Sequence, residues 1–375
     1  MFEQIIFYVA LCVLALALLR FVVAITNLLS PVYLPNAVSE VSTPVSVLIP
    51  ARNEEKNLSL LLSDLQQQDY NNIEILIYDD RSQDRTADIV RHFAASDRRI
   101  RLLQGDELPQ GWMGKTFACH NLSLQATGGY FLFLDADVRL KKSAITKIIY
   151  YATKHKLSLL SVFPQQEMQS LGEKAVVPLM NWILLSFLPL LFVRICRKYS
   201  FAAANGQCML FDAPLYRQYW WHNLVAGSPV EDIRIMQIIK KMKKRNILQQ
   251  HTATMLGNDD FSCRMYTNFR EAIEGFAKNI HYFFFRSYPV MIIIIAILSL
   301  GFIPVCIALP AKLILLYVGL VLTIKICCSI KSRQSLLIHI FLHPVHLVTL
   351  CVTAICSVKR GVQRKIIWKG REYKI

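Results

Sequence analysis

Three short groups of acidic and polar residues lie in the first 140 residues, each at the end of a predicted buried strand. Their sequences are PARNEE (50–55), DDRSQDRT (79–86) and DAD (135–137). Each group is weak by itself, because an acid after a strand often caps the next helix, and Asp84 or Ser82 could do only that. Together at one sheet edge they place several carboxylates in one crevice, where their repulsion is costly unless a cation lies among them. The three groups therefore predict a polar, cation-binding crevice.

Two further groups of charged residues stand at the starts of predicted helices. The segment GWMGK (111–115) precedes a predicted helix, where Lys115 adds a charge to the backbone donors that favour a phosphate. Glu231 and Asp232 open the predicted helix 232–245, where acids favour the positive end of the helix dipole and Asp232 stays ionised. Plainer interpretations stay open: an exposed lysine in a turn, and acids that only stabilise a helix.

The elements that must position these residues alternate along the chain. Periodicity predicts strands over 45–50, 73–80, 99–104 and 130–137, and helices over 54–68, 84–95 and 115–126. Strand–helix–strand repeats of this length favour parallel pairing with helices on both faces, and hence an open α/β sheet. In such a sheet the ligand lies beyond the carboxyl ends of the strands, where the three acidic groups are expected.

The motifs P-x-x-N-E-E, D-D-x-S-x-D-x-T, D-A-D and E-D, in this order and spacing, resemble those of family 2 glycosyltransferases. The segment GWMGK and the ending WKGREY (368–373) are similar to the membrane-bound subgroup of carotenoid and hopanoid-associated enzymes, whereas the Q-x-x-R-W motif of processive synthases is absent. The resemblance implies a GT-A fold, which is Rossmann-like with a mostly parallel sheet. It also implies inversion at the anomeric carbon.

The resemblance implies a role for each matching residue. Donor contacts are expected from residues of P-x-x-N-E-E, D-D-x-S-x-D-x-T, GWMGK and D-A-D, namely Ala51, Asn53, Glu54, Asp80, Lys115 and Asp135. Asp137 is expected to bind a divalent cation, Mg²⁺ or Mn²⁺, and Asp232 to be the catalytic base. The segment 205–207 (NGQ) is expected on the acceptor side. His251 is interpreted as an ordinary histidine, with a metal ligand as its alternative.

Composition and charge favour a membrane partner. Hydrophobic residues make up 54% of the chain and charged residues only 18%, against about 25% in soluble domains. The net charge of +16 is concentrated at the end: residues 287–375 contain 11 Lys/Arg and one acid, Glu372. Basic residues beside apolar segments follow the positive-inside rule, so a nucleic-acid partner is not expected. Six of the ten cysteines lie in apolar runs, as buried thiols of a reducing compartment do.

The sequence divides into four parts on this basis. We expect an N-terminal transmembrane anchor (1–35), a GT-A domain (41–286) with an interfacial helix near 175–193, C-terminal membrane helices (287–358) and a basic cytoplasmic tail (359–375). The apolar run 5–29 is long enough to span a bilayer and lacks the basic start of a signal peptide.

Charge also predicts the topology of a multi-pass protein of the cell (inner) membrane. The catalytic domain and the tail, with its seven Lys/Arg, are both expected in the cytoplasm. Only two of the three C-terminal apolar runs then cross fully. The run 335–357, interrupted at His343 and Pro344, is the expected re-entrant or interfacial segment.

These observations predict a membrane glycosyltransferase that moves one sugar from a nucleotide sugar, a UDP-sugar by preference, to a lipid. Two alternatives stay open. A processive polysaccharide synthase would need more spans and the missing Q-x-x-R-W motif, and a catalytically silent lipid-binding protein would not need Asp80, Asp137 and Asp232.

Overall fold

The computed structural model describes residues 1–36, 41–363, 365–368 and 371–374. The chain forms two compact units. The first, here called the helical unit, contains Met1–Ser30, Gln166–Pro189 and Met265–Ile375. The second, here called the sheet unit, contains Pro31–Gln165 and Leu190–Arg264.

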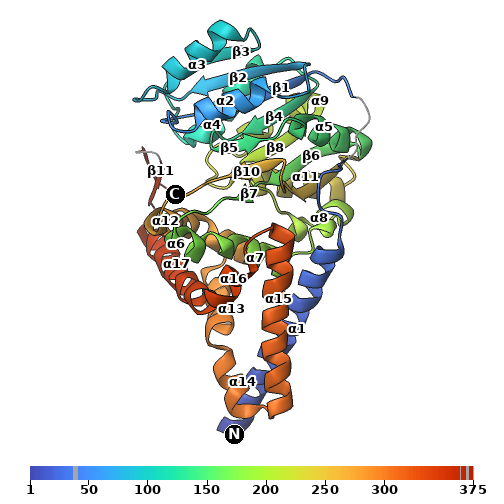
Figure 1. The fold of residues 1–375 in the computed structure, drawn as a ribbon, viewed down its shortest axis with the longest axis vertical. Coiled ribbons are helices and arrows are strands. Elements are labelled where there is room, and N and C mark those ends of the chain that lie inside the picture. The colour runs from blue at the N-terminus through green and yellow to red at the C-terminus, as the bar shows by residue number, and fades with distance from the viewer. Residues whose placement is uncertain (37–40, 364, 369–370, 375) are drawn as a thin grey trace. The chain divides into compact units, whose positions relative to one another are not determined.

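The sheet unit is built on seven strands (Figure 1). In order across the sheet they are β3 (Ile100–Gln104), β2 (Ile73–Asp79), β1 (Val45–Ala51), β4 (Tyr130–Leu134), β8 (Cys208–Asp212), β6 (Leu157–Phe163) and β9 (His251–Leu256). Neighbouring strands are parallel except where β8 pairs with β4 and β6. The predicted α/β fold with a mostly parallel sheet is therefore confirmed. A second sheet has three strands in the order β5 (Val138–Leu140), β10 (Phe261–Cys263) and β7 (Gln165–Gln166).

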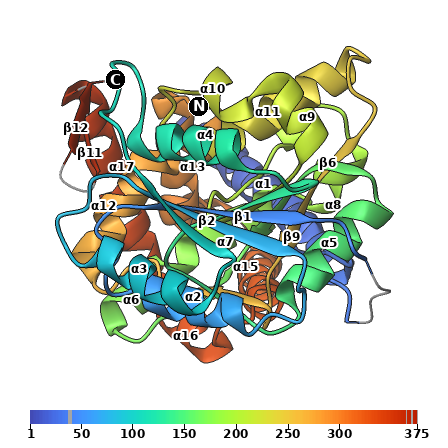
Figure 2. The ribbon, with the colours of Figure 1, turned by 90° about the horizontal axis from the view of Figure 1, so that it is seen from above.

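Helices cover both faces of the sheet. They are α2 (Leu58–Gln66), α3 (Thr86–Ser96), α4 (Gly114–Gln125), α5 (Ala144–Lys154), α8 (Leu191–Ile195), α9 (Ala213–Tyr219), α10 (Trp221–Leu224) and α11 (Glu231–Lys244), with a 3₁₀ turn at Tyr199–Phe201. Figure 2 shows α2 and α3 on one side of the sheet and α4 and α11 on the other. The central strand β1 is buried along nearly its whole length, as a run of aliphatic residues between two helix layers requires.

Helix α2 begins four residues later than predicted. The sequence favoured a start at Glu54, but Leu58 is the first helical residue. The backbone N–H of Glu54 donates a hydrogen bond to Thr86 Oγ1 at 2.8 Å, and that of Glu55 donates one to Asp84 Oδ2 at 3.0 Å. A contact that is distant in sequence thus replaces the first helical turn.

The helical unit contains most of the apolar sequence. Its elements are α1 (Phe2–Leu29), α6 (Leu171–Val176), α7 (Pro178–Phe187), α12 (Phe269–Asn279), a 3₁₀ turn (Ile280–Phe284), α13 (Tyr288–Leu300), α14 (Phe302–Ala308), α15 (Ala311–Ser332), α16 (Leu336–Phe341), α17 (His343–Gln363) and the hairpin β11 (Lys365–Trp368) and β12 (Arg371–Lys374). The segment 175–193, which is expected to contain an interfacial helix, is divided at its prolines. Pro178 supplies no N–H to continue α6, and α7 ends before Pro189.

Three helices in the described part of the chain are long and apolar enough to cross a membrane: Phe2–Leu29, Ala311–Ser332 and His343–Val362. A fourth candidate is the pair Phe269–Phe284 and Tyr288–Leu300, which is bent by 101°. The run 335–357 does break before His343, as expected, but the helix that follows is long enough to span. It is the run 288–309 that is divided into two short helices, at Gly301.

Candidate active site

The three acidic groups follow β1, β2 and β4, which are adjacent and parallel. Their carboxyl ends therefore lie at the same edge of the sheet. Ala51 is the last residue of β1, Asp80 follows β2 and Asp135 follows β4. The predicted crevice at one sheet edge is thus present in the fold.

The loops after β1 and β2 are joined by hydrogen bonds. The Asp80 N–H donates to Ala51 O at 2.8 Å, and the Asn53 N–H donates to Ser82 Oγ at 3.0 Å. The Gln83 N–H donates to Asn53 Oδ1 at 2.8 Å. Asn53 has a φ of 53°, in the left-handed region that asparagine tolerates better than most residues. Its side chain therefore braces the two loops.

The acids of the second loop have the structural role that the sequence left open. Asp84 Oδ1 accepts the Thr86 N–H at 3.0 Å in the first turn of α3, so Asp84 does stabilise the start of that helix. Ser82 does not, since its Oγ accepts the bond from Asn53 instead. Both residues hold the loop beneath Asp80, whose side chain is buried at 3% exposure.

Lys115 lies at the centre of a second group, here called the lysine cluster: Lys115, Asp135, Gly206, Glu231 and Asp232. Lys115 Nζ lies 2.8 Å from Asp135 Oδ1 and 3.2 Å from Glu231 Oε1. It also donates to Gly206 O at 3.2 Å. The Gly206 N–H in turn donates to Asp232 Oδ2 at 2.9 Å. One lysine thus connects residues from α4, α11 and the ends of β4 and β8.

The environment of Lys115 is not that of an exposed lysine in a turn. Lys115 is the second residue of α4, as predicted, but its ammonium group is engaged by two carboxylates. Burial disfavours the charged form, yet the attraction of Asp135 and Glu231 raises the pKa of Lys115 well above its ordinary value. The lysine therefore stays charged and holds Glu231 and Asp135 together.

Asp232 is the second residue of α11. We expected the helix N-terminus to keep its carboxyl fully ionised. Burial, followed by repulsion from Glu231, instead raises the pKa of Asp232 to about 7. Hydrogen bonds from the Ile233 and Gly206 N–H groups and the charge of Lys115 act in the opposite direction. The carboxyl is thus poised to exchange a proton near neutral pH, which is the range that suits a general base.

Asp137 adjoins the other carboxylates of the edge. Burial, then the charges of Asp135 and Glu54, raise the pKa of Asp137 to about 7. Its Oδ1 is buried without a hydrogen-bond partner. A divalent cation would remove both penalties, because carboxylate oxygens are the ligands that Mg²⁺ and Mn²⁺ prefer.

The donor set at this edge fits such a cation. Among the described residues, no group of three or more His, Cys, Asp or Glu side chains is arranged to hold a metal ion. Mg²⁺ in nucleotide enzymes is held by one or two carboxylates together with phosphate oxygens of the substrate. Asp137 with Asp135 would satisfy that requirement.

Three functional residues escaped the sequence analysis in whole or in part. Gly206 was placed only loosely on the acceptor side. A Cβ at Gly206 would lie 2.9 Å from Lys115 Nζ and 3.0 Å from Glu231 Oε1, so only glycine fits the lysine cluster as it stands. Glu231 was given no role of its own. Cys263 hydrogen bonds with Asp137, a contact that no local sequence pattern indicates.

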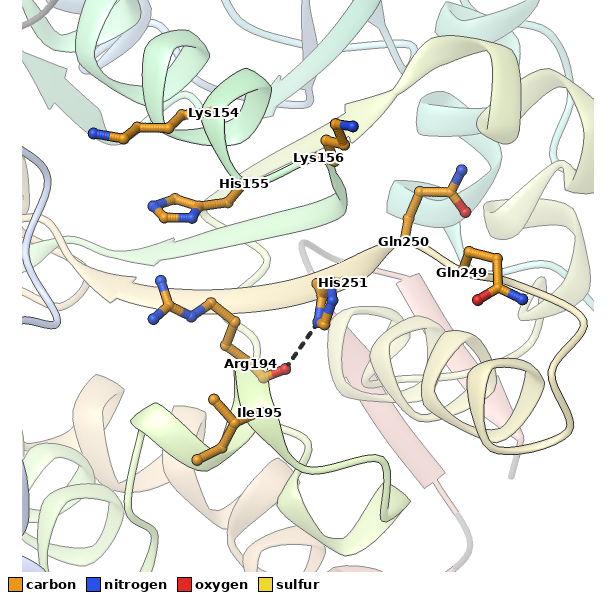
Figure 3. Close-up of a pocket in the computed structure, with 8 residues that line it drawn as sticks. All are labelled: Lys154, His155, Lys156, Arg194, Ile195, Gln249, Gln250 and His251. Carbon is orange, nitrogen blue, oxygen red and sulfur yellow. Dashed lines mark hydrogen bonds between the residues drawn. The ribbon is translucent and has the colours of Figure 1, made fainter.

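His251 lies away from this edge and is no metal ligand in the described part of the chain. It begins β9 and lines a cavity of about 510 Å³ with Lys154, Lys156 and Arg194 (Figure 3). Its Nδ1 lies 3.3 Å from Arg194 O. Cations beside a histidine repel a metal ion, so the interpretation of His251 as an ordinary histidine is the one that the structure favours.

Comparisons with known proteins agree with this geometry. Residues 46–220 match the family model described as Glycosyl transferase family 2. A 4,4'-diaponeurosporenoate glycosyltransferase of Staphylococcus haemolyticus is 38% identical over 127 residues, which are 33% of each chain. Its counterpart in Staphylococcus aureus strain USA300 is 34% identical over 122 residues, 32% of this chain and 31% of that one. The matched region thus spans about a third of these curated relatives.

The fold has a solved counterpart. The mannosyltransferase PcManGT from Pyrobaculum calidifontis, solved in complex with GDP-Man and Mn²⁺, superposes with a TM-score of 0.56 at 14% identity. The match covers 96% of this chain and 99% of that one. At this identity the likeness concerns the fold, which is of the GT-A type.

Proposed function

We propose that this chain, whose residues 46–220 belong to glycosyl transferase family 2, transfers a single sugar from a nucleotide sugar to a membrane lipid, with inversion at the anomeric carbon. A UDP-sugar is the donor that we infer first. The observation that carries the proposal is the lysine cluster, which holds Asp232 at the same sheet edge as Asp135 and the loop of Asp80.

Asp232 is proposed as the base that takes the proton of an acceptor hydroxyl. A base that contributes to the rate needs a pKa near the working pH, and burial beside Glu231 supplies one of about 7. The N–H groups of Gly206 and Ile233 each donate to one carboxylate oxygen. These bonds fix the orientation of the carboxyl while each oxygen keeps a second lone pair for the proton.

Asp137 and Asp135 are proposed to hold a divalent cation, Mg²⁺ or Mn²⁺, which when bound neutralises charge on the diphosphate leaving group. The nucleoside side of the pocket would be shaped by Ala51, Asn53, Glu54 and Asp80. Hydrogen bonds join the two loops that carry them, and Asp80 is buried there. Lys115 is proposed to hold Glu231 close to Asp135.

A lipid acceptor is supported by the three helices that are long and apolar enough to span a membrane. It is also supported by relatives that are named for glycosylating an apolar carotenoid acid. We propose that the sheet unit and the basic tail face the cytoplasm, where nucleotide sugars are made and where basic residues accumulate. The single-transfer reaction is preferred to processive synthesis because the Q-x-x-R-W motif is absent.

The test uses the full-length protein in vesicles that contain a total lipid extract. Radiolabelled UDP-glucose, UDP-N-acetylglucosamine and GDP-mannose are offered in turn with Mn²⁺. We expect label from one donor to enter the organic phase with stoichiometric release of the nucleoside diphosphate, and thin-layer chromatography to show one sugar per lipid. No label in the organic phase with any donor would contradict the proposal, and a ladder of products would favour a processive enzyme.

Asp232→Asn and Asp88→Asn form the matched pair for this assay. Asp88 is an exposed residue of α3, paired only with Arg91, so its variant should transfer sugar normally. Asp232→Asn should keep donor affinity. With a hydroxyl acceptor it should lose about 10²–10⁴-fold in rate. With a carboxylate acceptor, which is already ionised at neutral pH, the loss should be below about tenfold.

A further inference from the structure

The helical unit contains a cavity of about 260 Å³. Most of its lining is aliphatic and comes from α1, α13 and α15. Its polar lining consists of Arg20, Trp182, Tyr317 and His343. A cavity that is apolar over most of its surface and polar at a few points has the general character of a small-molecule site.

Arg20 is the charged residue of this lining and is buried, with 5% of its surface exposed. Its Nη2 and Nε donate to Ser186 Oγ at 2.8 and 3.3 Å. The guanidinium carbon lies 4.8 Å from the ring centroids of Trp182 and Phe187. A guanidinium carries five N–H donors, so these contacts leave several without an oxygen acceptor.

A second buried cation lies on the same indole ring. Lys325, with 1% exposure, places its Nζ 4.0 Å from the Trp182 ring centroid and 3.3 Å from His346 Nδ1. Trp182 is itself 2% exposed, and its Nε1 is a buried donor without a partner among the described residues. Arg20 and Trp182 thus line the polar end of the cavity, and Lys325 lies against the Trp182 ring behind that lining.

The described apolar helices supply no carboxylate to balance these two basic residues. Beyond Glu3, the apolar elements α1, α7 and α13 to α17 contain no Asp or Glu. Glu3 is 17 residues before Arg20 on one helix, or about 25 Å along its axis. In the part of the chain that the structure describes, the ionisable groups that act on Arg20 and Lys325 are Cys328, Tyr317, His346 and each other.

Buried charges are normally paired, because an isolated one is very costly to remove from water. Intramembrane Arg and Lys residues accordingly mark binding sites or pathways. Since no carboxylate of this chain is at hand, the counter-ion has to come from another molecule. Its apolar part must suit the aliphatic lining.

We propose that this cavity binds an amphiphile with one anionic head group, a carboxylate or a phosphate, and an apolar chain. The head group accepts hydrogen bonds from Arg20 and from Trp182 Nε1 and is attracted by Lys325. The apolar chain lies along the aliphatic residues of α1, α13 and α15. The residues of this site belong to the helical unit and are not those of the sheet edge described above, and the proposal does not rest on the proposed function.

Trp182 provides the measurement. Of the other tryptophans whose side chains the structure describes, Trp112, Trp220 and Trp221, none lines the cavity. Delipidated full-length protein in a neutral detergent is titrated with 9,10-dibromostearate, whose bromines quench nearby indoles. We expect saturable quenching that disappears in Trp182→Phe. Dibromostearate methyl ester has the same chain without the charge, and its affinity, measured by quenching, should be lower by about tenfold or more.

Variants then test the role of the charge. Arg20→Gln should weaken dibromostearate binding about ten- to hundredfold, the value of a charge-assisted hydrogen bond. Arg20→Lys should keep most of the affinity. Lys312→Gln removes a cation from an exposed position near the start of α15 and should bind as the parent does. Dibrominated phosphatidylglycerol and phosphatidylcholine, offered in the same way, distinguish a phosphate head group from a carboxylate.

Each outcome decides the proposal. Tighter binding of the acid or of phosphatidylglycerol than of the neutral lipids, with loss in Arg20→Gln, supports it and identifies the source of the anion. Equal quenching by the acid and its methyl ester overturns it, and this comparison needs no variant to fold. An equal loss in Lys312→Gln also overturns it, because the effect would then come from net charge alone.

Discussion

Gly206 is the point at which the candidate site tolerates least change. Adding one methyl group, in Gly206→Ala, would place a Cβ 2.9 Å from Lys115 Nζ, 3.0 Å from Glu231 Oε1 and 3.6 Å from Asp232 Oδ2. All three are ends of side chains rather than backbone. They can therefore move by a few tenths of an ångström, and the fold survives while the lysine cluster is displaced.

The expected magnitudes differ for stability and for catalysis. Overpacking costs about 1–3 kcal/mol of stability. Because the side-chain ends in contact are mobile, we expect a loss near the lower limit, which lowers the Tm by about 2–4 °C in a domain of this size. A displacement of catalytic groups by about 1 Å can cost about 10²-fold in rate, or about 2.7 kcal/mol in the barrier. Gly206→Ala should therefore lower kcat far more than stability.

The assay is single-turnover transfer at saturating donor, with thermal unfolding measured on the same preparations. Gly319→Ala is the control, because a Cβ at Gly319 meets nothing within 4 Å, and it should be fully active. A Gly206→Ala enzyme with at least half the parental rate would refute the reasoning, since the close contact of Gly206 with Lys115 would then be irrelevant to the reaction. Loss of folding would refute the claim that the side-chain ends can yield.

Three other predictions concern the same edge of the sheet. Burial and Glu231 raise the pKa of Asp232 to about 7, and a general base must be ionised to accept a proton. For a hydroxyl acceptor, kcat/KM should therefore fall about tenfold per pH unit below pH 7 and level off above it. A pH profile that is flat from pH 5 to 8 would exclude Asp232 as the base. Lys115→Met should destabilise the fold by about 2–3 kcal/mol, because Glu231 loses its cation; chemical denaturation measures this effect, with the exposed Lys56→Met as the control. The same variant should shift the acidic limb of the kcat/KM profile to higher pH, since Lys115 lowers the pKa of Asp232. Asp137→Asn should abolish Mn²⁺-dependent donor binding in calorimetry, and unchanged affinity would move the metal site elsewhere.

Much of the sheet unit could be predicted from local patterns. The strands β1, β2, β3 and β4 begin within a residue of their predicted positions, because runs of aliphatic residues between polar turns can be buried in only one way. The convergence of the three acidic groups also follows from sequence, since consecutive parallel strands end at the same edge. Connectivity alone decides these features.

Contacts between distant residues could not be predicted in this way. Lys115 meets Gly206 O across 91 positions and Glu231 across 116, and the meeting depends on β8 entering the sheet antiparallel beside β4. The same applies to Asn53, whose side chain accepts a hydrogen bond from Gln83 in the next loop. Neither contact leaves a local pattern, because each depends on which strands become neighbours.

The membrane helices show the same division between sequence and fold. Their existence and their lack of acidic residues are legible in the sequence, since an apolar run of about 20 residues is a local property. The contact of Arg20 and Lys325 with one indole ring could not be predicted from the sequence. The two residues are 305 positions apart, and only the packing of α1, α7 and α15 brings them together. Hydrophobicity determines which segments are buried, whereas side-chain packing between segments determines which charges must share a site.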